Sequence, residues 1–196
     1  MVIKNERVMR ILELIDKFKV CDVTQIARLY YRNNKYSIQD AQLKLSRLVK
    51  EKTLKRIRND INSRYIYYRG KDPAQVHHKL LITEIYVRMA LEFGESNIEI
   101  ITEYTQIKGI RPDAFIKVIN NKRIYYFFVE VHVSNNPFDF QKYENTFISE
   151  AYTNVFPAGV FPSIIIISDK KVEPVKSSLR YIVTDKDFRN FFKMIF

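Results

Sequence analysis

The sequence predicts an α+β protein with two domains, a basic one over residues 1–71 and a neutral one over residues 72–196. Residues 1–71 carry 18 basic and seven acidic side chains, whereas residues 72–196 carry 15 of each, so the net charge of +11 lies in the first domain. The apolar spacing in each domain changes between the helical period and the alternation typical of strands. Asp72 and Pro73 mark the junction, because the residue before a proline disfavours helix.

Composition excludes several classes of protein. The 196 residues are 46% hydrophobic with four glycines and six prolines, which is typical of a folded chain and not of a disordered or fibrous one. The longest apolar runs are about ten residues, too short to cross a bilayer, and no secretory signal opens the chain. The single Cys21 excludes an intramolecular disulfide and a thiolate zinc cluster. We therefore expect a cytoplasmic protein with no membrane partner.

The first domain is expected to begin with three helices. Apolar side chains recur at helical spacing over residues 6–18, and Asp22 can cap a second helix. Ser37 can cap a third. The apolar face of this third helix would carry Ile38, Ala41, Leu45, Leu48 and Val49. From residue 54 the pattern alternates, which predicts a basic β-hairpin with its turn over residues 60–63.

This order of helix, helix, helix and hairpin resembles the winged helix-turn-helix family over residues 5–71, with AQLKLSRLVKEKTL as a recognition helix that runs into a wing. Thr53 stands near the place where many members have glycine. The resemblance implies that the third helix enters the major groove and that the wing contacts the DNA backbone. The DNA-binding residues it implies are Gln39, Gln42, Lys44, Arg47, Lys50, Arg56, Arg58 and Arg64.

The basic charge favours duplex DNA as the partner of this domain. Two alternatives stay open. The charged face can be a solvated surface of a protein-binding scaffold. Tyr65, Tyr67 and Tyr68 can also stack on the bases of single-stranded RNA.

The second domain is expected to follow the order α-β-β-β-α-β, with one sheet flanked by helices. Its strands would include an antiparallel meander, because a turn at residues 120–122 joins two of them. The expected elements are a helix over 74–93, strands over 97–105, 112–120 and 124–133, a helix over 138–152, a strand over 161–168, a short helical stretch, a strand over 181–185 and a final helix over 186–196.

A carboxylate pair is expected at one end of this meander. Glu130 and His132 are two residues apart on one strand and therefore face the same side. Asp113 opens the preceding strand, and an antiparallel hairpin would bring it near Glu130. Two or three carboxylates around one point bind Mg²⁺ or Mn²⁺, which polarises a phosphodiester and activates water. The alternatives are that Asp113 closes a turn or caps a hydrogen bond, and that Glu130 belongs to an ordinary buried ion pair.

The strand order and the residues Pro112, Asp113 and Glu130 resemble the PD-(D/E)XK nuclease family. The resemblance implies Asp113 and Glu130 as metal ligands, with Glu84 on the preceding helix completing the site. His132 stands where the family has lysine, and a histidine is neutral much of the time at pH 7. It can still act as a base or a metal ligand, while Lys142 on the following helix can replace the missing charge.

The basic first domain together with HHKLLITEIYVRM, RPDAFI and FFVEVHVSNN resembles the replication-relaxation family of plasmid and phage-like elements. This implies a dimeric duplex DNA-binding protein that controls replication or transcription of a plasmid or mobile element. Its nuclease-like domain would be inactive and serve dimerisation or DNA contact, with no cofactor needed for binding. The alternative is a DNA endonuclease dependent on Mg or Mn that uses Glu84, Asp113 and Glu130, assisted by His132 or Lys142.

Overall fold

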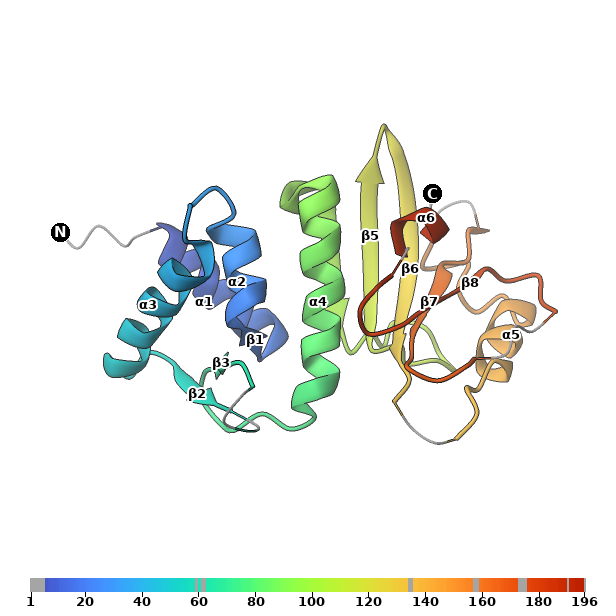
Figure 1. The fold of residues 1–196 in the computed structure, drawn as a ribbon. Helices are drawn as coiled ribbons and strands as arrows, with labels where there is room; N and C mark the ends of the chain where they lie inside the picture. The colour runs from blue at the N-terminus through green and yellow to red at the C-terminus, as the bar shows by residue number, and fades with distance from the viewer. Residues whose placement is uncertain are drawn as a thin grey trace. The chain divides into compact units, whose positions relative to one another are not determined.

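The computed structural model describes residues 6–58, 60, 63–133, 136–156, 159–172, 176–189 and 191–195. Over these residues the protein is α+β, with two separate β-sheets (Figure 1). The predicted class is therefore confirmed. The chain divides into two compact units, Met1–Gly94 and Glu95–Phe196, and each is described by itself. Of the helices described, none combines the length and the apolar character needed to span a bilayer.

The first unit places helices beside a small antiparallel sheet of strand order β1-β3-β2. Its elements are α1 (Glu6–Phe18), β1 (Cys21–Asp22), α2 (Val23–Tyr30), α3 (Ser37–Lys50), β2 (Lys55–Ile57), β3 (Ile66–Tyr68) and α4 (Val76–Phe93). The cap predicted at Asp22 is confirmed: its carboxylate accepts the Gln25 N–H at 2.8 Å, and the Gln25 side chain accepts the Asp22 N–H at 3.0 Å. This reciprocal pair satisfies two free donors at the start of α2.

Both ends of α3 differ from the expectation. The helix is capped by Tyr36, without a side-chain bond, and not by Ser37, because the Asp40 N–H already donates to the Tyr36 carbonyl at 2.9 Å. At the other end Lys52 adopts a φ of +58°, the left-handed turn that glycine often provides. The Thr53 N–H then donates to the Leu48 carbonyl at 2.9 Å, so the helix ends in a Schellman motif without glycine.

The inward face of α3 is mostly as predicted. Ala41, Leu45 and Leu48 are buried, but Ile38 in the first turn is 46% exposed. The hairpin that follows is formed by β2 and β3, which pair antiparallel. Of the turn predicted over residues 60–63, positions 61 and 62 lie outside the described residues, while the Ser63 N–H donates to the Asp60 carbonyl at 3.2 Å.

Helix α4 belongs to the first unit, although the sequence boundary at residue 72 would assign it to the second. Buried Thr83 donates its hydroxyl proton to the Val20 carbonyl at 3.1 Å. The buried amide of Gln25 donates to the Leu80 carbonyl at 3.0 Å. These contacts join α4 to α2 and to the segment before it, so the compact unit extends to Gly94.

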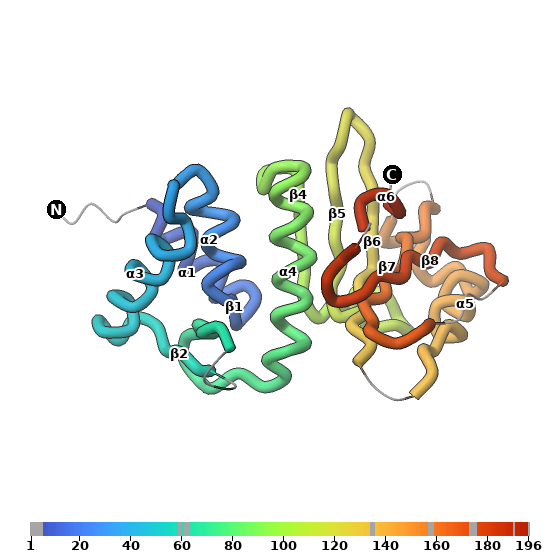
Figure 2. Tube along the Cα trace, in the orientation of Figure 1, coloured from blue at the N-terminus to red at the C-terminus, as the bar shows by residue number. Residues whose placement is uncertain are grey.

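The second unit is built on one five-stranded sheet of order β4-β5-β6-β7-β8. Its elements are the short 3₁₀ helix Glu95–Asn97, then β4 (Ile98–Thr102), β5 (Ala114–Asn120), β6 (Arg123–Val131), α5 (Gln141–Ile148), β7 (Ser163–Ile167), β8 (Tyr181–Thr184) and α6 (Phe191–Ile195). Strands β4, β5 and β6 form the antiparallel meander that was predicted, and β6, β7 and β8 run parallel. The long hairpin of β5 and β6 can be followed in Figure 2. Its turn places Asn121 and Lys122 at φ values of +50° and +64°.

An aromatic core holds α5 against the sheet. Phe128 on β6 lies 6.0 Å from the ring of Tyr143 on α5 and 5.9 Å from that of Phe156, measured between centroids. Two expectations for the end of the chain are wrong in extent. The final helix is shorter than 186–196, and no helix precedes β8 in the described part of residues 169–180. The packing of α5 brings its first turn to the C-terminal end of β6, where the predicted carboxylates lie.

Candidate nucleic-acid interface and strand-end carboxylate cluster

The outer surface of α3 carries a row of side chains at helical spacing, and we call Gln39, Leu43, Arg47 and Lys50 the α3 face. All four are exposed, and Ala41, Leu45 and Leu48 are buried on the opposite side of the helix. Successive members are four, four and three residues apart, so they line one surface. Arg47 donates to the Glu51 carboxylate at 2.8 Å, yet its side chain remains 72% exposed.

The other two helix residues predicted to bind DNA flank this row. Gln42 is exposed, whereas Lys44 is half-buried and lines a pocket of about 450 Å³. Arg7 of α1 lies in the same pocket, with its guanidinium 4.6 Å from the centre of the Tyr31 ring. The sequence reasoning missed Arg7 and Leu43. The helical spacing of Leu43 from Gln39 could have identified it.

The hairpin of β2 and β3 places two of its cations on an aromatic ring. The guanidinium carbons of Arg56 and Arg58 lie 4.3 Å and 4.0 Å from the centre of the Tyr65 ring, so one tyrosine orients two arginines. Arg64 turns elsewhere and donates to Thr24 Oγ1 at 3.0 Å, beside Asp22. Of the wing arginines predicted to contact the DNA backbone, two therefore lie together and the third lies at the start of α2.

The tyrosines of the hairpin do not form an open stacking surface. Tyr67 is 0% exposed and Tyr68 is 4% exposed, while Tyr65 is partly exposed and covered by the two arginines. The alternative of single-stranded RNA needs accessible rings on the sheet. Two of the three rings proposed for it are buried in the core.

At the end of β6, four side chains form what we call the Glu130 cluster: Asp113, Glu130, Lys142 and Tyr143. The pairing of Ala114 with Val129 continues to place Asp113 beside Glu130, as predicted. The Asp113 carboxylate accepts the Val131 N–H at 2.8 Å. Asp113 therefore also fixes the end of the hairpin, which was the structural alternative for this residue.

Glu130 is 8% exposed and is held by two donors. Its Oε1 accepts from Lys142 Nζ and from the Tyr143 hydroxyl, both at 2.5 Å. Burial raises the pKa of Glu130 above its ordinary value, and the charge of Asp113 adds to this, whereas Lys142 and Tyr143 act in the opposite direction. Burial beside Glu130 also raises the pKa of Tyr143, so the phenol stays protonated and donates.

His132 packs against a ring at the edge of this cluster. Its backbone N–H donates to the Ile167 carbonyl at 2.8 Å. Its imidazole meets Phe138 edge to face, with centroids 5.6 Å apart and an angle of 90°. The cation next to Glu130 is therefore Lys142 from α5, and His132 has an aromatic contact instead.

Glu84 has ionic partners within the first unit. Its Oε1 accepts from Arg28 Nη1 and from Arg88 Nε, both at 2.6 Å, so it links α2 to α4. This differs from its expected role as a third metal-binding acid. Among the described residues, no group of three or more histidine, cysteine, aspartate or glutamate side chains is placed to hold a metal ion.

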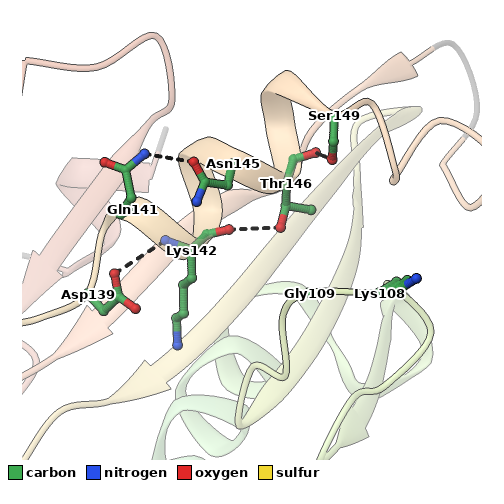
Figure 3. Close-up of a pocket in the computed structure, with 8 residues that line it drawn as sticks. All are labelled: Lys108, Gly109, Asp139, Gln141, Lys142, Asn145, Thr146 and Ser149. Carbon is green, nitrogen blue, oxygen red and sulfur yellow. Dashed lines mark hydrogen bonds between the residues drawn. The ribbon is translucent and has the colours of Figure 1, made fainter.

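A polar pocket of about 660 Å³ lies along α5 (Figure 3). It is lined by Lys108, Gly109, Asp139, Gln141, Lys142, Asn145, Thr146 and Ser149. Several of its polar groups bond to one another: Gln141 donates to Asn145 at 2.8 Å, and the Thr146 hydroxyl donates to the Lys142 carbonyl at 2.8 Å. The pocket and the Glu130 cluster share Lys142, whose ammonium is held at Glu130.

No family model, curated protein or solved structure matches this chain. The features of the molecule that bear on its function are therefore the α3 face, the hairpin of β2 and β3, and the Glu130 cluster.

Proposed function

We propose that the protein binds duplex DNA through its first unit, which acts as a winged helix-turn-helix. The α3 face enters the major groove, and the hairpin of β2 and β3 contacts the phosphate backbone. The observation that carries this proposal is the α3 face, an exposed row of one amide, one apolar and two cationic side chains on a helix whose other side is buried. The order of helices and strands in this unit supports it as well.

The chemistry of these side chains suits DNA. Glutamine can pair with adenine through two hydrogen bonds, and arginine can do so with guanine. Arg56 and Arg58 on the wing add cations that suit phosphate, and residues 1–71 hold the whole net charge of +11. A polyanion is the partner that this distribution favours.

For the second unit we propose a nuclease-like domain without catalytic activity, which serves dimerisation or DNA contact. The support is the state of Glu130: its carboxylate already has two short hydrogen bonds and a raised pKa, which opposes metal binding. DNA binding then needs no cofactor. From the resemblance of the sequence motifs to the replication-relaxation family, we infer a biological role in control of replication or transcription of a plasmid or mobile element.

The test is the salt dependence of binding to a duplex of randomised sequence, measured by fluorescence anisotropy. For the natural protein, log affinity should fall linearly with log salt. In the variant Arg56→Ala/Arg58→Ala, which removes the two hairpin cations proposed to contact phosphate, the slope should shrink by about 0.9 for each lost phosphate contact. The control Lys122→Ala/Arg123→Ala removes the same charge from the exposed turn of the second unit. A slope near zero, or equal losses in both variants, would contradict the proposal.

A second candidate is a DNA endonuclease dependent on Mg or Mn. The observation that favours it is the position of Lys142, which supplies beside Glu130 the cation that His132 does not. The test is incubation with supercoiled plasmid and Mg²⁺ or Mn²⁺. Asp113→Asn is the control, since it removes the charge and keeps an acceptor for the Val131 N–H. No cleavage, or equal cleavage by the variant, excludes this activity.

A further inference from the structure

Leu43 occupies the centre of the α3 face and is 76% exposed, the highest value among the exposed large apolar side chains of the described residues. It projects opposite the buried stripe of α3, with Gln39 one turn before it and Arg47 one turn after it. Tyr36 and Ile38 at the start of this helix are also exposed, at 57% and 46%. Three of the eight exposed large apolar side chains among the described residues therefore lie at the helix that carries the exposed cations.

A single exposed leucine needs no explanation by itself. The position of Leu43 is what distinguishes it, because its neighbours on the same surface are groups that suit a polyanion. In the major groove, the one apolar group on the base edges is the C5-methyl group of thymine. Four helical residues rise about 6 Å, so Leu43 would lie within one or two base pairs of the contacts made by Gln39 and Arg47.

On the basis of the proposed DNA binding, we propose that Leu43 determines base-sequence specificity by packing against the methyl group of a thymine. The flanking polar side chains hold α3 in register, and Leu43 then removes the methyl group from water. Uracil lacks only this methyl group, so it isolates the contact. Burial of one such group corresponds to about a fourfold change in affinity.

The experiment starts from a duplex that the natural protein enriches from a pool of randomised sequences. Each thymine in turn is replaced by deoxyuridine, and affinities are measured by anisotropy. For the natural protein, replacement of one particular thymine, or of a few, should lower the affinity about fourfold. Leu43→Ala should bind the thymine and uracil duplexes equally, and Leu43→Met should keep the preference. Ile148→Ala is the matched control, because Ile148 is 74% exposed on α5 of the second unit.

The outcomes separate this inference from the proposed function. If no duplex binds at all, DNA binding itself is wrong. If a duplex binds but every thymine can be replaced without loss, or if Leu43→Ala keeps the uracil penalty, then DNA binding stands and the role of Leu43 is wrong. A loss of preference in Ile148→Ala would likewise overturn it. Thermal unfolding of Leu43→Ala should match that of the natural protein, since the side chain is exposed.

Discussion

The α3 face and the Glu130 cluster both contain a cation beside a carboxylate, and burial makes them different. Arg47 meets Glu51 at 2.8 Å with side chains 72% and 48% exposed. Lys142 meets Glu130 at 2.5 Å with side chains 29% and 11% exposed. The exposed pair contributes little to stability, because water and salt screen the attraction between its charges. Arg47 can therefore exchange Glu51 for a phosphate. The Glu130 side of the buried pair is largely shielded from water, so its carboxylate depends on its partner. Residue types alone do not distinguish a binding surface from an internal ion pair.

The largest effect is expected from Lys142→Met. This change leaves the carboxylate of Glu130 buried with Tyr143 as its remaining donor, and removing one partner of a buried pair should lower the free energy of unfolding by about 2–4 kcal/mol. Urea unfolding at neutral pH measures it. The control is Lys186→Met, since Lys186 and Asp169 form a pair at 3.2 Å with both side chains about half exposed. Equal losses in the two variants would contradict the distinction between buried and exposed pairs.

The second effect concerns pH. Burial raises the pKa of Glu130 above its ordinary value of 4.5, so the folded protein retains a proton that the unfolded chain has released. This contribution to stability is complete below pH 4.5 and is lost as the pH rises through the folded-state pKa. Relative to Glu130→Gln, the natural protein should therefore lose free energy of unfolding across that window. Urea unfolding at a series of pH values tests the sign. A gain with rising pH would contradict it.

The third effect concerns the hairpin of β2 and β3. Tyr65 orients Arg56 and Arg58 without carrying charge itself, so Tyr65→Ala should weaken duplex binding by about two- to fivefold and leave the salt slope unchanged. Tyr65→Phe keeps the ring and should restore the affinity. Anisotropy titrations at several salt concentrations measure both quantities. A similar loss in the phenylalanine variant would show that the ring does not position the arginines.

The α+β class and most elements could be predicted from the sequence because long amphipathic periods and alternating runs are local signals. Strand β1 has two residues, too few to show alternation. The extent of the first unit depends on Thr83 and Gln25, which bond to carbonyls that are 63 and 55 residues away in the sequence. Such contacts leave no local pattern.

The candidate site could likewise be predicted only in part from the sequence. Asp113 and Glu130 could be brought together by strand register, and Lys142 could be identified as a replacement cation. Tyr143 could not, because it resembles an apolar residue in a helical pattern and its hydroxyl contact is visible only after α5 packs on β6. Glu84 was assigned by its place on a helix, and its two arginines come from α2 and from the next turn of α4.

The smallest effect tests Arg64, which the resemblance to winged helices predicts to contact the DNA backbone. Its guanidinium donates to Thr24 at 3.0 Å and lies 3.9 Å from the carboxylate of Asp22, so it already has a neutral and an ionic partner in its own unit. Arg64→Ala should lower the free energy of unfolding by less than about 1 kcal/mol, because the side chain is 66% exposed. The salt slope of duplex binding should stay the same, whereas Arg58→Ala should reduce it by about 0.9. If Arg64→Ala also reduces the slope, the arginine leaves Thr24 for phosphate, and the exposure of its side chain outweighs the hydrogen bond that holds it.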